Sequence, residues 1–170
     1  MKKLVTLLLT AALAITAATT AFADHQIGPD ANGNPNPASK AIPVTYTVAP
    51  KYTVTIPASV TLDSDSKSGT ATIVVKDVTV DFGKKVKVAL NKGTFDVTTD
   101  EGATLPCKVT KGTNKTPVND NGTVLEVAPA SKSGSETLTF AITDPVVYSG
   151  TYKGTVTFEV SVVGSQTTNP

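Results

Sequence analysis

The sequence predicts an all-β protein, an antiparallel Ig-like β-sandwich with Greek-key connections. Short runs in which apolar and polar residues alternate have the period of half-buried strands. Gly, Pro, Asn and Asp separate these runs at close spacing, as turns between strands require. Thr and Val dominate the composition, Trp is absent, and no window after residue 23 has the spacing of an amphipathic helix. We therefore expect two sheets with apolar side chains between them.

The bulk composition limits the classes of function. The chain has 170 residues, of which 39% are hydrophobic and 17% charged, which suits one domain of ordinary size. The formal net charge is +1, and it becomes about −1 if Lys2 and Lys3 are removed with a signal peptide. Every basic residue is Lys, so no guanidinium is available to clamp phosphate. This balance argues against nucleic acid and anionic membrane as partners.

Residues 1–23 have the pattern of a cleaved signal peptide. Two lysines precede an apolar run from Leu4 to Ala18, and Ala21-Phe22-Ala23 supplies the small residues of a cleavage site. The apolar run is too short and too early for a transmembrane anchor. We expect an exported protein that begins at Asp24, is secreted or extracellular, and is associated with the bacterial cell surface without an integral membrane anchor.

Residues 24–41 are predicted to be a disordered polar linker, because Gly, Pro and Asn crowd it and apolar periodicity is missing. His25, the only histidine, lies here without neighbouring metal ligands. The β-sandwich is expected over residues 42–163, followed by a flexible tail over residues 164–170.

The strands of this domain follow from the alternation. We expect them at Val44–Val48, Tyr52–Ile56, Val60–Leu62, Ala71–Val75, Val78–Val80, Val86–Leu90, Phe95–Val97, Leu105–Thr110, Val124–Val127, Glu136–Ile142 and Gly150–Val162. The last strand has the longest alternation, and five residues of it share one apolar face: Tyr152, Val156, Phe158, Val160 and Val162.

Four segments between the predicted strands carry specific expectations. The polar pair Lys76-Asp77 separates two strands of opposite phase, which predicts a bulge or a crossing between sheets. Asp81–Lys84 is expected to be a turn, and Asn91–Gly93 a hairpin turn. Lys111–Gly122 is expected to be a long polar loop.

The residues that could carry chemistry do not converge in the sequence. The predicted domain contains no His, which removes the commonest general base and excludes Ser-His-Asp and Cys-His arrangements. Asp77 and Asp81 are the carboxylates on which a hydrolase hypothesis would rest, and nearby lysines favour surface ion pairs instead. We therefore expect no enzyme, no catalytic residues and no cofactor.

Two further residue groups have a specific and an ordinary interpretation. Asp63 and Asp65 alternate with serines and are a weak calcium candidate, but the glycine and closing glutamate of the known twelve-residue loop are missing. A solvated turn is the ordinary interpretation. Cys107 is in phase with Leu105 and Val109, so we expect a small buried hydrophobe rather than a reactive thiol.

The final strand, from Gly150-Thr151-Tyr152-Lys153-Gly154 to Phe158-Glu159-Val160, resembles the closing strand of small exported surface proteins of Gram-positive bacteria. It is similar to the WxL group, in which Trp-x-Leu stands where this chain has Phe158-Glu159-Val160. WxL proteins bind the cell wall non-covalently, so the resemblance implies a wall-binding module. The same strand resembles that of fimbrial and spore-coat-type subunits.

Assembly by strand donation makes a further demand on the sequence. A donor needs an N-terminal extension of alternating apolar residues. Residues 24–41 are polar and rich in Pro, so they do not serve. Ile42–Ile56 has the pattern, but we expect the domain to need these residues for its own first strands.

The expected function is that of an exported cell-surface structural or adhesive module without catalytic activity. The alternatives are a non-covalent cell-wall or glycan-binding module of WxL type and a fimbrial-type subunit. The partner is expected to be a cell-wall polymer, a glycan or another surface protein. An aromatic residue out of phase with the core would mark a binding site, and Tyr148, just outside the last two strands, is the candidate. A tyrosine that packs within its own loop is the ordinary interpretation and the one we expect.

Overall fold

The structure is a computed structural model that describes residue 32 and residues 42–164, and its regular elements there are all strands. They are β1 (Lys51–Thr55), β2 (Ser68–Thr79), β3 (Lys84–Leu90), β4 (Thr94–Thr98), β5 (Thr104–Lys111), β6 (Thr116–Pro117), β7 (Gly122–Val127), β8 (Gly134–Ile142) and β9 (Phe158–Gly164). No helix in this part of the chain is long and apolar enough to cross a membrane. The predicted signal peptide and linker lie outside the described residues, apart from residue 32.

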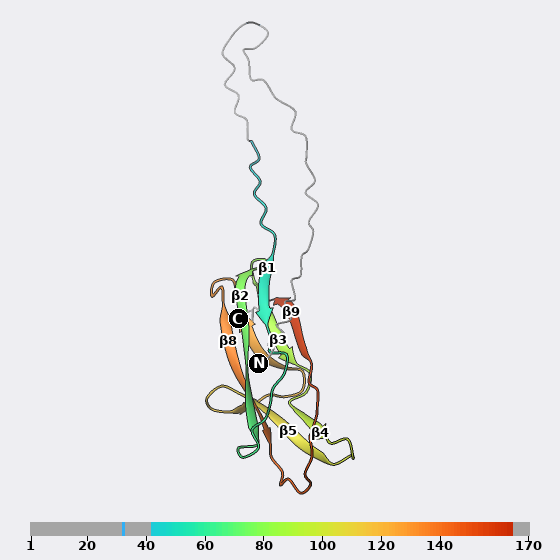
Figure 1. Ribbon diagram of the computed structural model, residues 1–170. Helices are drawn as coiled ribbons and strands as arrows, with labels where there is room; N and C mark the ends of the chain where they lie inside the picture. The colour runs from blue at the N-terminus through green and yellow to red at the C-terminus, as the bar shows by residue number, and fades with distance from the viewer. Residues whose placement is uncertain (1–31, 33–41, 165–170) are drawn as a thin grey trace, which may run out of the picture. The chain divides into compact units, whose positions relative to one another are not determined.

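The strands form two antiparallel sheets (Figure 1). The larger has the order β1-β2-β8-β5-β4, with β6 added beside β5, and the smaller has the order β7-β3-β9. The prediction of an all-β, antiparallel, sandwich-like fold is confirmed. The Ig-like Greek key is not: β9 pairs with β3, whereas immunoglobulin domains place the last two strands of the chain side by side.

The core lies between the two sheets and is built from the alternate residues of each strand. Val86, Val88 and Leu90 of β3 are fully buried, as the alternation predicted. Ile73 and Val75 of β2 meet them from the larger sheet in one apolar cluster. Leu138 and Phe140 of β8 and Cys107 of β5 are buried in the same cluster, which confirms their predicted direction. The strands therefore follow the period of two that their sequences show.

The change of phase at Lys76-Asp77 is a β-bulge. Lys51 pairs with Thr79 and Thr53 pairs with Lys76, so β2 has one residue more than β1 over this stretch. Asp77 has a φ of 56°, a conformation that Asp adopts more readily than most residues. The extra residue lets both Val75 and Val78 point into the core. The prediction of a bulge at this pair is confirmed.

Two predicted strands are wrong. Val44–Val48 and Val60–Leu62 have no strand pairing, and the first strand begins at Lys51. Residues 57–62 run as an irregular segment along the inner face of the larger sheet, where Val60 and Leu62 pack against the core. Alternation indicates which residues share a face, but strand structure also requires a neighbouring backbone to pair with.

The predicted final strand is correct only in its second half. β9 begins at Phe158, and of residues 150–157 only Lys153 makes a bridge, to Thr98 of β4. Lys153 thus belongs to the larger sheet and Phe158 to the smaller one, so the chain crosses between sheets in this stretch. Gly154 permits the crossing, because a Cβ there would lie 2.8 Å from the carbonyl oxygen of Asp96.

The predicted hairpin turn at Asn91–Gly93 is also wrong, because β3 and β4 lie in different sheets. The connection is held instead by other loops. Asn91 Oδ1 accepts a hydrogen bond from the Thr157 amide at 2.9 Å, and the Asn91 amide donates to the Thr157 carbonyl at 3.0 Å. The Gly93 amide donates to Asp120 Oδ1 at 2.8 Å. Asn91–Gly93 does connect two strands, but the chain crosses here from the smaller sheet to the larger one and does not form a hairpin.

We predict that Gly93→Ala destabilises the protein by about 3 kcal/mol or more. A Cβ at residue 93 would lie 1.6 Å from the carbonyl oxygen of Val118, and backbone on both sides would have to move. Urea denaturation measures the loss. Gly164→Ala is the matched control, because a Cβ there meets nothing within 4 Å. Equal stability of the two variants would contradict this packing.

Candidate functional site

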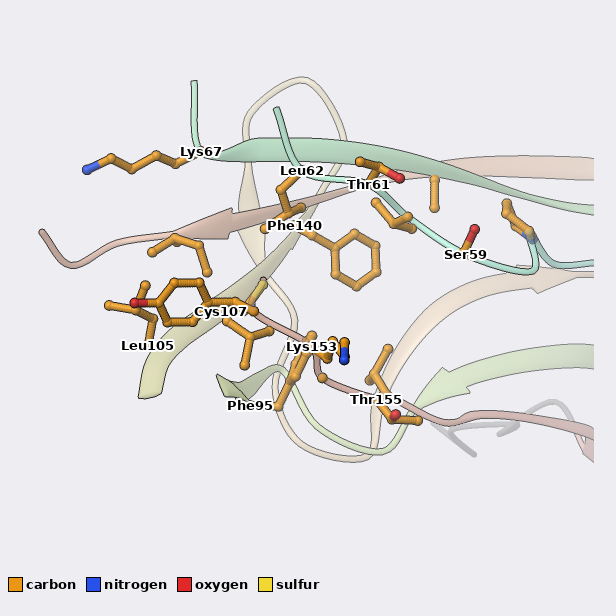
Figure 2. Close-up of a pocket in the computed structure, with 18 of the residues that line it drawn as sticks. Ser59, Thr61, Leu62, Lys67, Phe95, Leu105, Cys107, Phe140, Lys153 and Thr155 are labelled. Carbon is orange, nitrogen blue, oxygen red and sulfur yellow. The ribbon is translucent and has the colours of Figure 1, made fainter. Parts of the chain in front are cut away.

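An apolar cleft of about 1200 Å³ opens along one side of the sandwich. Its walls are β1, the irregular segment 57–62, the adjoining ends of β5 and β8, and the crossing segment that precedes β9. Figure 2 shows Phe140 projecting into the cleft between Leu62 and Phe95. The Phe95 and Phe140 rings meet edge to face, with centroids 6.4 Å apart. Apolar side chains with few polar groups among them are the usual lining of a binding cleft.

The cleft exists because irregular chain replaces strands at this side. β3 and β7 cover one half of the larger sheet, and their inward-facing valines are buried. The other half is covered by residues 57–62 and by residues 150–157, which pack less closely than paired strands do. Tyr52, Val156 and Phe158 remain only partly buried there.

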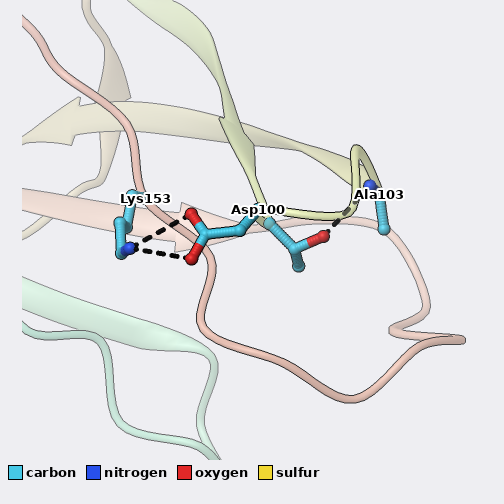
Figure 3. Close-up of polar contacts among 4 residues, drawn as sticks. Asp100, Ala103 and Lys153 are labelled. Carbon is cyan, nitrogen blue, oxygen red and sulfur yellow. Dashed lines mark hydrogen bonds and ion pairs between the residues drawn. The ribbon is translucent and has the colours of Figure 1, made fainter.

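A second, polar hollow of about 770 Å³ adjoins the cleft. It is lined by the turn of the β4–β5 hairpin, residues 99–103, and by residues 148–151. Figure 3 shows Lys153 turned toward Asp100, with Nζ 3.2 Å from Oδ1. The Ala103 amide donates to Thr99 Oγ1 at 3.1 Å, which closes the turn. The lysine–aspartate pair is exposed, so it orients the two side chains more than it stabilises the fold.

Tyr148 lines both the cleft and the polar hollow, and its side chain is 67% exposed. The Tyr152 hydroxyl donates a hydrogen bond to the carbonyl oxygen of Tyr148 at 2.9 Å. Val146 and Val147 precede it and are exposed as well. Tyr148 therefore stands outside the core, and its backbone is held in place from the cleft side.

This apolar loop lies at the end of the sandwich opposite both ends of the described domain. Lys51 at the start of β1 pairs with Thr79, and Gly164 at the end of β9 pairs with Lys84, on either side of the β2–β3 turn. The β4–β5 turn and the residues after β8 lie at the other end of these strands. We call residues 99–103 and 146–151 the distal tip.

The calcium candidates lie in a turn on the rim of the cleft. Asp63 Oδ1 accepts backbone hydrogen bonds from Ser66 at 2.8 Å and from Asp65 at 3.2 Å. These bonds, chiefly those from Ser66, hold the pKa of the Asp63 carboxyl below its ordinary value. In residues 42–164 no three His, Cys, Asp or Glu side chains gather in a metal-binding group. The geometry around Asp63 is that of a turn closed by its own side chain.

The remaining candidates lie apart from the distal tip. Asp81 is paired with Lys84 in the β2–β3 turn, at 2.7 Å, and Asp77 is the bulge residue of β2. Cys107 is buried, as predicted, and burial raises the pKa of its thiol. The predicted Lys111–Gly122 loop contains the short strand β6 and a buried Val118.

Comparisons with known proteins place the chain in no family: no protein-family model matches the sequence, and no curated protein matches it.

Reading the sequence missed most of the distal tip. The approach of Asp100 and Glu101 to Tyr148 depends on the bridge between Thr98 and Lys153. That bridge joins residues 55 positions apart, so no local pattern marks it. The exposed run Val146-Val147-Tyr148, next to Pro145, was the one signal available.

We predict that millimolar calcium leaves the melting temperature of the protein unchanged, because Asp63 Oδ1 already accepts two backbone amides. Asp63→Ala should lower the melting temperature by removing these bonds, and Asp65→Ala, which removes none of them, should not. Thermal unfolding with calcium and with a chelator measures both effects. A calcium-dependent rise that either variant abolishes would restore the calcium hypothesis.

We predict that the Cys107 thiol reacts about a thousandfold or more slowly in the folded protein than in urea, since reaction requires opening of the core. Its raised pKa also has a consequence for stability. Burial of the neutral thiol contributes to the free energy of unfolding. This contribution is fully present below the thiol pKa of the unfolded chain, about 8.5, and is lost as pH rises through the higher thiol pKa of the folded protein. Cys107→Ala should remove this alkaline loss. A thiol reagent and urea denaturation against pH check both statements.

Proposed function

We propose that this protein is an exported cell-surface adhesive module without catalytic activity, and that it binds its ligand at the distal tip. The observation that carries the proposal is the exposed Val146-Val147-Tyr148 loop at the end of the sandwich opposite Lys51 and Gly164. Chain that enters and leaves at one end leaves the other end free to make contacts. The signal-peptide pattern of residues 1–23 supports export.

The chemistry of the distal tip favours a glycan as the ligand. Tyr148 offers an apolar ring face and a polar hydroxyl, which suits the mixed surface of a sugar. Asp100 and Glu101 line the adjoining hollow, and carboxylates accept hydrogen bonds from hydroxyl groups. Val147, 77% exposed, extends the apolar surface beside the ring. This supports the alternative suggested by the WxL resemblance, a module that binds the cell wall non-covalently.

We also propose that the sandwich is related in architecture to Ig-like surface domains. The chain crosses repeatedly between two antiparallel sheets, as it does in Ig-like surface domains. The pairing of β9 with β3 gives this module its own strand order.

We predict that the purified protein co-sediments with isolated peptidoglycan sacculi at moderate salt and that Tyr148→Ala lowers the bound fraction, with affinity falling about tenfold or more. Truncation removes the ring on which the proposed contact depends. Salt resistance is expected because apolar contacts and hydrogen bonds to a neutral glycan are screened little by salt.

Phe82→Ala is the matched control. Phe82 is a fully exposed aromatic residue, and it lies in the β2–β3 turn at the opposite end of the sandwich. The Phe82→Ala variant should bind sacculi as the wild type does. Protein that stays in the supernatant would refute wall binding, and equal losses in the two variants would refute the distal tip as the site.

A further inference from the structure

The apolar side chains on the inner face of β9 are less buried than those of β3, the strand with which β9 pairs. Val86, Val88 and Leu90 of β3 are fully buried. Their direct partners on β9 face the same side, yet Phe158 and Val160 are only partly buried and Val162 is 40% exposed. On its other side β9 pairs with no strand of the described chain. Phe158 and Val160 line the apolar cleft together with Tyr52 and Val54 of β1, so the sandwich is open along the seam between β9 and β1.

The edge of β7 differs in this respect. Val124 and Val127 are buried although β7 also ends the sheet, and Leu125, the partner of Val88, is partly buried. Among the described strands, β9 alone carries an exposed large apolar side chain, Val162, and its outer edge makes no backbone pairing. Such an edge accepts an added strand, whose backbone extends the sheet while alternate side chains fill the gap.

The segment Ile42–Val48 has the sequence of such a strand. Its apolar residues are Ile42, Val44, Tyr46 and Val48, and all four are exposed, Val44 by 92% and Tyr46 by 88%. The intervening residues are Pro43, Thr45 and Thr47. The segment belongs to no strand, since the domain's first strand begins at Lys51. The domain therefore does not use these residues for its own sheets, contrary to the expectation from the sequence.

We propose that Ile42–Val48 of one copy adds to the β9 edge of a second copy and closes its seam. Donor and acceptor have the same length, seven residues each, so one strand covers the whole of β9. Antiparallel addition places Val44 and Tyr46 over the uncovered side chains, and the threonines outside. The donor segment carries no charge, which suits an apolar seam.

Antiparallel addition of Ile42–Val48 to β9 requires a second copy. Only Ala49 and Pro50 separate Val48 from Lys51, and Lys51 lies at the end of the sandwich where β9 finishes. Antiparallel pairing within one chain would require Val48 to reach the start of β9, a strand about 23 Å long. Two residues do not span that length. Pairing between copies uses different surfaces on each and continues from copy to copy.

The test compares substitutions on the two faces of the donor strand Ile42–Val48. Val44→Asp with Tyr46→Asp places two charges on the face that enters the seam, and Thr45→Asp with Thr47→Asp places them on the other face. Light scattering after size exclusion, over a concentration series of the purified protein, should give multiples of the monomer mass for the wild type and the threonine variant. The Val44/Tyr46 variant should lose the association.

A mixing experiment then identifies the acceptor. Val162→Lys blocks the seam at a site exposed enough to tolerate lysine, so this variant alone should be monomeric. Mixed with the Val44/Tyr46 variant, which keeps an intact acceptor, it should form a heterodimer. Monomeric wild type, equal behaviour of the two parity variants, or a monomer whose residues 42–48 are protected from hydrogen exchange would each overturn the proposal.

This inference is independent of glycan binding at the distal tip. Val162→Lys leaves residues 99–103 and 146–151 unchanged and should still co-sediment with sacculi at the monomer's affinity. Tyr148→Ala should still associate with itself. The failure of one proposal is thus distinguishable from the failure of the other.

Discussion

The crossing at Asn91–Gly93 is the constraint on which the rest of the structure depends. Asn91 exchanges hydrogen bonds with Thr157, and its carbonyl oxygen accepts one from Asn121. Gly93 binds Asp120 and accepts a hydrogen bond from Val109. These contacts join four segments that are distant in the chain. They direct β4 into the larger sheet and Phe158 into the smaller one, so the partition of strands between sheets is set here.

This partition leaves the two sides of the sandwich unequal. On the side of β7, paired strands face each other and the core is closed. On the side of β9, the larger sheet is covered by irregular chain, and an apolar cleft and an open seam result. Apolar surface left accessible in this way is costly in water and commonly marks an interaction surface.

The two ends of the sandwich differ as well as its two sides. The end that contains Lys51 and Gly164 connects it to the rest of the chain, and the distal tip carries Tyr148 beside Asp100 and Glu101. A ligand at the distal tip and a second copy at the β9 seam would occupy separate surfaces. The proposed adhesive function and the proposed assembly are therefore compatible in one molecule.

The fold class, the direction of the buried side chains on β2, β3, β5 and β8, and the bulge at Asp77 were predictable from local alternation, because they depend on the two-residue period of a strand. Only the tertiary structure decided which alternating segments pair: Val44–Val48 alternates without a partner, and residues 150–157 cross between sheets. Strand pairing depends on hydrogen bonds between backbones far apart in the chain, which local periodicity does not encode. The approach of Asp100 to Lys153 and Tyr148 was decided in the same way, by the bridge from Thr98.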